Sequence, residues 1–190
     1  MEEVEIGTQI WMENLNVETF KNGYSILEAK TEKKWIKAGE KKQPAWCYYD
    51  NDPIKGEKFG KLYNWHAVND PRGLAPTGWH IPTDEDWTIL TDHLGGVDES
   101  GKKMKFTAYW ADNKDKSGNG TNESGFSGLP GGARDIDGKF EDLFRFGSWW
   151  NSSEGGTYGP WILDLGFSFD KARKGSEHKN AGISVRCVKD

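Results

Sequence analysis

Residues 76–90, which read PTGWHIPTDEDWTIL, constrain the fold of this chain more than any other stretch. A loop containing proline and glycine ends at Thr83, a favourable helix N-cap, and three acidic residues follow at the positive end of the helix dipole. From Trp87 onward apolar residues recur at helical spacing, and the glycine pair at 95–96 supplies a left-handed stop. The pattern predicts a capped amphipathic helix that begins at residue 84. The pattern also indicates that the three acidic residues are present as favourable first-turn charges of the helix rather than as a catalytic cluster.

The composition predicts one domain with an aromatic core. Only 35% of the 190 residues are hydrophobic, but ten are Trp, nine are Phe and six are Tyr. Each large ring buries much apolar area, and the 24 glycines indicate many turns between short elements. We therefore expect residues 1–190 to form a single domain.

Charge and hydropathy argue against two classes of partner. The net charge is −5, and the 25 Lys and Arg are scattered among 30 acids, whereas a nucleic-acid site needs a concentrated basic face. No window reaches the roughly 18 apolar residues that a membrane-spanning helix requires. We expect neither nucleic-acid binding nor a transmembrane segment.

The order of the apolar patterns predicts an α+β fold. Residues 4–15 are typical of a short strand or hairpin, and residues 20–45 indicate a polar, lysine-rich insertion with small strands of its own. Apolar spacing over residues 62–69 predicts another helix, before the capped one. Short strands separated by glycine-containing loops are expected around residues 126, 140, 149–150, 161–163 and 183–188. Two helices early and several strands late are typical of α+β domains.

Motifs along nearly the whole chain, apart from that insertion, resemble those of a known family. In order they read IGTQIWMENLN, CYYDND, FGKLYNWHAV, GWHIPTDEDWTIL, GFSGLPGGARDIDGKF, WWNSSE and ISVRCVKD. This set resembles the Fibrobacter succinogenes major paralogous domain, which is similar in turn to the formylglycine-generating enzyme group and to the C-type lectin fold. The resemblance implies two helices packed on small, twisted, mainly antiparallel sheets with long loops. It also implies a bacterial protein that is secreted or attached to the cell surface.

The residues required for the enzyme group's oxidase chemistry are missing. That chemistry needs a redox-active cysteine pair shortly before the terminal strand, and residues 163–178 contain no cysteine. Cys187 matches the structural cysteine of the terminal strand instead. Cys47 and Cys187 are compatible with a disulfide, which would stabilise the fold by about 4–5 kcal/mol, or equally with two separate buried thiols.

Other catalytic signatures are also incomplete. Leu129 replaces the second glycine of a nucleophile elbow, and residues 128–132 lack the Gly-Lys-Ser/Thr of a phosphate loop. The four histidines show no zinc-ligand spacing. The chain is therefore more readily interpreted as a non-catalytic domain than as an enzyme, and no cofactor is required.

Calcium is the one metal that the sequence leaves open. Asp135, Asp137 and Asn119 offer the oxygen ligands that a hard cation prefers, but no EF-hand spacing is present. Asn and Asp are also frequent in turns, and we favour that interpretation.

Aromatic residues in the late loops are the candidates for ligand binding. Trp149, Trp150, Tyr158 and Trp161 could stack on a sugar or fill a protein hot spot. Because side chains alternate along a strand, one of the adjacent pair Trp149 and Trp150 should face inward and the other outward. The leading hypothesis is a recognition domain for a glycan or a protein. The alternatives are an enzyme with different chemistry on the same scaffold, or a purely structural surface domain.

Overall fold

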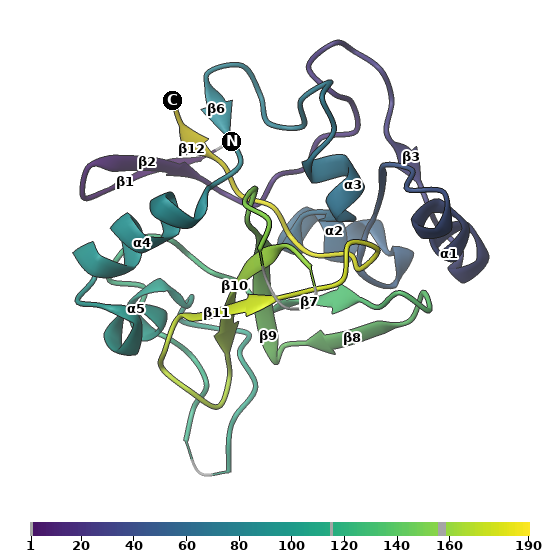
Figure 1. The fold of residues 1–190 in the computed structure, drawn as a ribbon. Coiled ribbons are helices and arrows are strands. Elements are labelled where there is room, and N and C mark those ends of the chain that lie inside the picture. The colour runs from purple at the N-terminus through teal and green to yellow at the C-terminus, as the bar shows by residue number, and fades with distance from the viewer. Residues whose placement is uncertain (1, 115, 156–158) are drawn as a thin grey trace.

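The computed structural model describes residues 2–114, 116–155 and 159–190, and within them the chain is an α+β domain (Figure 1). Five α-helices alternate with short strands in the first part of the chain, whereas the last part is mostly strand and loop. The helices are α1 Glu32–Glu40, α2 Pro53–Phe59, α3 Trp65–Val68, α4 Asp84–His93 and α5 Val97–Met104. None of the helices in these ranges is long and apolar enough to cross a membrane.

One small sheet joins the two ends of the chain. Its order is β1 (Glu3–Ile6), β2 (Gln9–Met12), β12 (Val188–Lys189) and β6 (Trp79–His80), all antiparallel. β1 and β2 form the predicted hairpin, and both chain ends lie beside this sheet in Figure 1. The motif around residue 80 is thereby fixed against the C-terminus.

Three further sheets complete the fold. The largest is antiparallel and has the order β11 (Arg173–Ser176), β10 (Trp161–Gly166) and β9 (Phe146–Trp150). The hairpin of β7 (Gly131–Arg134) and β8 (Phe140–Leu143) packs next to it, through β7 and β9. The third contains β3 (Leu27–Glu28), β4 (Ala45–Cys47) and β5 (Leu62–Tyr63), with β3 and β4 parallel.

The core consists of three aromatic clusters rather than one layer. Trp149 belongs to a cluster with Trp11 and Phe126, whereas Trp150 belongs to a second cluster with Tyr63. Both Trp149 and Trp150 are fully buried because β9 is covered on both faces. The prediction that one of the two rings faces outward is therefore wrong, since alternation exposes a ring only where one face of a sheet meets solvent.

The helix at residue 84 confirms the capping prediction. The Thr83 Oγ1 accepts a hydrogen bond from the Asp86 N–H at 3.2 Å, and the Asp86 carboxylate accepts one from the Thr83 N–H at 2.8 Å. This reciprocal pair is a capping box. After α4, Gly95 and Gly96 adopt φ values of 101° and 92°, as the predicted stop requires.

Two local predictions need correction. Residues 20–45 contain a helix, α1, as well as the short strand β3, and the α1 residue Trp35 is buried in the third cluster with Leu62. This segment is therefore more than a polar insertion with small strands, because its helix contributes to the core. The helix predicted over 62–69 begins only at Trp65, because the Asn64 side chain accepts from the Ala67 N–H and caps it there.

Four buried cations tie distant segments together. Lys61, Lys105, Arg134 and Arg186 are each no more than 3% exposed. Each donates a hydrogen bond to at least one backbone carbonyl of a segment more than 40 residues away. Because buried carbonyls of irregular loops need donors, these cations stabilise a fold that has few long strands.

Candidate ligand-binding groove

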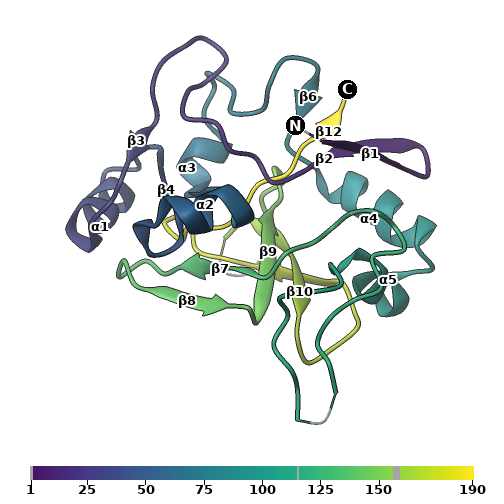
Figure 2. The same cartoon turned by 180° about the vertical axis from the view of Figure 1, so that it is seen from behind.

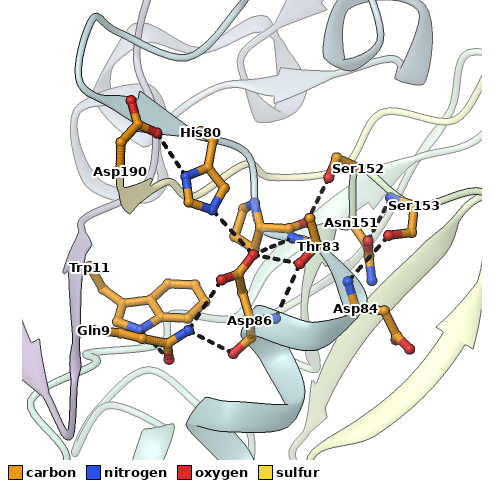
Figure 3. Close-up of polar contacts among 11 residues, drawn as sticks. Gln9, Trp11, His80, Thr83, Asp84, Asp86, Asn151, Ser152, Ser153 and Asp190 are labelled. Carbon is orange, nitrogen blue, oxygen red and sulfur yellow. Dashed lines mark hydrogen bonds and ion pairs between the residues drawn. The ribbon is translucent and has the colours of Figure 1, made fainter.

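The motif that defines α4 contains a histidine between two carboxylates (Figure 3). His80 Nδ1 lies 2.9 Å from the Asp190 carboxylate and its Nε2 lies 3.2 Å from Asp86. Burial raises the pKa of Asp86, but hydrogen bonds from Thr83 and from His80 outweigh it and the pKa is lowered. The Thr83 hydroxyl donates to Asp86 rather than to the histidine, so His80 does not activate Thr83 as a nucleophile.

The same network docks neighbouring segments onto the start of α4. The Gln9 amide donates to Asp86, and its carbonyl oxygen accepts from the Trp11 indole. On the other side, the Ser153 hydroxyl accepts from the Asp84 N–H and the Ser152 N–H donates to the Pro82 carbonyl (Figure 3). The motif therefore connects β2, the start of α4 and the segment after β9, in agreement with a structural rather than a catalytic role.

The predicted aromatic ligand-binding set does not form one surface. The Trp149 indole donates to Asn14 and the Trp150 indole to the Tyr63 carbonyl, both inside the core. A fully buried ring offers no face to a sugar, so we assign these two residues to the core. Trp161 is half-buried, and the Lys174 ammonium lies 4.2 Å from its ring centroid. Tyr158 lies outside the described residues.

The three predicted calcium ligands occupy two places. Asp135 and Asp137 belong to the β7–β8 turn, where their carboxylates accept hydrogen bonds from the N–H groups of Ile136 and Lys139. Asn119 accepts from the Trp110 N–H instead. These contacts fit the turn interpretation. In the described chain no group of three or more His, Cys, Asp or Glu side chains is placed to hold a metal ion, and calcium binding stays a prediction.

A groove lies between α2, the segment after β2, and the long segment that joins α5 to β7. It consists of two adjoining hollows of about 220 and about 230 Å³, which share Lys58, Ser127 and Leu129 in their walls. Figure 2 shows the side of the molecule on which α2 and β1–β2 lie. The groove is polar at one end and aromatic at the other.

The aromatic end is a platform of two parallel rings. Phe106 and Tyr109 have ring centroids 6.2 Å apart with an interplanar angle of 7°. Tyr109 is 44% exposed, and the Lys58 ammonium lies 3.2 Å from its ring centroid. An offset parallel pair of this kind presents a broad apolar surface, and the Lys58 ammonium lies over its Tyr109 ring.

Backbone strain accompanies this platform. Tyr109 and Ser127 both line the groove with left-handed φ values of 76° and 54°. Asn119 fixes the peptide after Tyr109 by accepting from Trp110, and Asn122 accepts from the Ser127 N–H at 2.7 Å. Such conformations cost free energy and persist where the surroundings impose them, often at ligand sites.

The polar end is lined by acids and amides above a buried arginine. Glu13 and Glu57 are exposed, as is Asn16. Arg186 lies beneath them and donates to Asn14 and to the carbonyls of three other residues, among them Ser127. Burial lowers the pKa of the Arg186 guanidinium to about 9. This side chain holds the floor of the groove.

Sequence reasoning missed the groove. Its only local signal was Phe106 and Tyr109, two aromatic residues in a segment otherwise rich in polar residues and glycine. The contribution of α2 and of residues 13–16 depends on packing between segments about 50 to 100 residues apart, which spacing does not reveal.

These features define the class of the protein, a small α+β domain whose described residues form five helices and several small, mainly antiparallel sheets. A family model described as the Fibrobacter succinogenes major domain matches residues 4–189, so the chain belongs to that family, as its motifs predicted. No curated protein and no solved structure gives a significant match.

Proposed function

We propose that this domain is a non-catalytic recognition module that binds carbohydrate in the groove between α2 and the segment joining α5 to β7. The observation that carries the proposal is the junction of an aromatic platform, Phe106 and Tyr109, with a polar hollow. The resemblance to C-type lectin-like domains supports it and leads us to infer the same fold. A secreted or surface location, implied by the same resemblance, belongs to the proposal.

The chemistry of the groove suits a sugar. The apolar C–H face of a pyranose ring can pack on an exposed aromatic ring, while its hydroxyls need donors and acceptors at the edge. Lys58 supplies a donor over the Tyr109 ring, and Glu57 and Glu13 supply acceptors. The side-chain oxygen of Asn16 already accepts from Lys61, so Asn16 offers its amide N–H groups as donors. None of the ion pairs among the described residues involves Glu13 or Glu57. The Glu13 carboxylate accepts one hydrogen bond, from the Glu2 N–H at 3.4 Å, and its second oxygen can accept from a hydroxyl group.

The state of the cysteines argues against oxidase chemistry on this scaffold. Cys47 and Cys187 are both free thiols, are fully buried, and belong to different core clusters. Burial raises the pKa of each thiol to about 12, so both remain protonated at neutral pH. A thiol in that state is a poor nucleophile and a poor ligand for copper(I).

A glycan array probed with the full chain tests the proposal. We expect selective binding that the Tyr109→Ala and Phe106→Ala variants weaken at least about tenfold, because anchor side chains at the centre of a site carry much of its binding energy. Tyr24→Ala is the matched control, since Tyr24 is also an exposed aromatic residue, 66% accessible, and does not line the groove.

Two results would overturn the proposal. An array without signal above background would remove the carbohydrate ligand. Equal loss of binding in the Tyr24 and Tyr109 variants would place the binding surface outside the groove.

A further inference from the structure

A second pocket, of about 190 Å³, lies between the β9–β10–β11 sheet and the β7–β8 hairpin. It shares no lining residue with the groove. Its wall brings together four carboxylates from three segments: Glu141 and Asp142 on β8, Asp164 on β10, and Glu177 just after β11. Concentrated negative charge is present although no local run of acids predicts it.

Asp164 is an inward-directed carboxylate without an ion-pair partner. Its cross-strand neighbour on β11 is Arg173, but that guanidinium lies over the Phe169 ring, 5.0 Å from the centroid. Among the described residues, the Ser148 hydroxyl donates a hydrogen bond to the Asp164 carboxylate. None of the ion pairs in the described ranges includes any of the four carboxylates. The Asp164 charge in the pocket wall is therefore only partly compensated, by the Ser148 hydrogen bond and by the charge of Arg173 at longer range.

The acids of the pocket also repel one another. Burial is the main cause that raises the pKa of Asp164 to about 6. The Ser148 hydrogen bond and the charge of Arg173 lower this pKa, and the charges of Glu177 and Asp142 raise it by smaller amounts. The pKa of Glu141 is raised by burial and by its acidic neighbours. A positive charge placed among these groups would relieve this repulsion.

The shape of the pocket favours an organic cation over a bare metal ion. A metal needs several oxygen ligands around one point, and no such group of three is present in the part of the chain that the structure describes. Ile162, Ile183 and Phe146 form apolar parts of the wall. Such a wall suits the methylene stem of an amine or guanidine better than a hydrated ion.

We propose that this pocket binds an ammonium or guanidinium group carried on a short apolar stem, with Asp164 as the counter-ion. Asp142, Glu141 and Glu177 surround the entering charge, and Ser148 orients the Asp164 carboxylate. The cation could be a lysine or arginine side chain of a partner protein, or a free amine, because the recognised chemistry is the same.

Titration calorimetry with the full chain tests this inference. Blocked arginine and lysine amides represent a side chain, and agmatine and cadaverine represent free amines. Blocked citrulline and norleucine amides are the neutral counterparts. We expect the cationic probes to bind at pH 7. They should bind about tenfold more weakly at pH 5, because only about a tenth of a carboxyl group with a pKa of about 6 is ionised at that pH. The stronger pair of probes identifies the source.

Two variants and one control complete the design. Asp164→Asn should abolish detectable binding, and Glu177→Gln should weaken it severalfold, in protein whose melting curve shows that it is folded. Asp112→Asn, a change at an exposed carboxylate that lines neither the groove nor this pocket, should leave the affinity unchanged. Equal binding of the citrulline amide, absence of binding by every cationic probe, or stoichiometric calcium binding that displaces the cationic probes would overturn the proposal.

Discussion

Replacing Asp164 by asparagine should stabilise the protein at neutral pH. The folded-state pKa of this carboxyl is about 6, against an ordinary value of 3.8. The raised pKa means that the folded state favours the protonated form, so the destabilisation is absent well below pH 3.8 and fully present above about pH 6. Asparagine keeps the shape and the hydrogen-bonding capacity while removing the charge.

The magnitude follows from the difference between the two pKa values. A shift from 3.8 to about 6 is about two units, and each unit corresponds to about 1.4 kcal/mol. We therefore expect Asp164→Asn to raise the free energy of unfolding by about 3 kcal/mol at pH 7. The gain should fall to about 1 kcal/mol at pH 4.5, where the carboxyl of the folded protein is already protonated.

Urea denaturation of both proteins at pH 7 and pH 4.5 measures this effect. An unchanged dependence of the unfolding free energy on urea concentration would show that the unfolded state is not altered. Asp112→Asn is the matched control, because Asp112 is an exposed carboxylate and its substitution should change stability by no more than about 0.5 kcal/mol. If Asp164→Asn is no more stable than the parent at pH 7, the carboxylate is compensated in the folded protein and the reasoning fails.

Three further predictions test the fold itself. Thr83→Ala should lower the free energy of unfolding by about 1 kcal/mol through loss of the helix cap, whereas Thr83→Ser should retain most of it, as urea denaturation would show. Arg186→Met should cost about 3 kcal/mol or more, because the carbonyls of Met12, Phe126 and Ser127 lose a donor and Asn14 keeps only the Trp149 indole; a loss below about 1 kcal/mol would contradict that role. Cys47 and Cys187 should not react with a thiol reagent in the native protein, and both should react after denaturation without reductant; fewer than two reactive thiols would contradict the free-cysteine assignment.

Where the determinants are local, the sequence predicted the structure. The capped helix α4, its glycine stop and the β1–β2 hairpin all follow from residues within a few positions of one another. A cap depends on a side chain and a backbone N–H three residues apart, so its signal is present in a short stretch. The family assignment has the same basis, because it rests on seven short motifs.

The predictions that failed concern burial. Trp149 and Trp150 are adjacent in the chain and both are buried, because separate core clusters cover the two faces of β9. Trp35 packs the lysine-rich helix α1 against the core, although the composition of this segment indicates only a polar insertion. Whether a strand or helix is covered on one side or on both depends on segments far away along the chain.

The stretch at residues 76–90 determined by itself the capped helix α4, and its Asp86 serves both the cap and the His80 network. Only the tertiary structure decided where a ligand can bind. The groove at Phe106 and Tyr109 and the pocket at Asp164 each combine side chains from segments tens of residues apart. Secondary structure follows from nearest-neighbour chemistry, whereas a concave site follows from how distant elements pack, and that information is distributed over the whole chain.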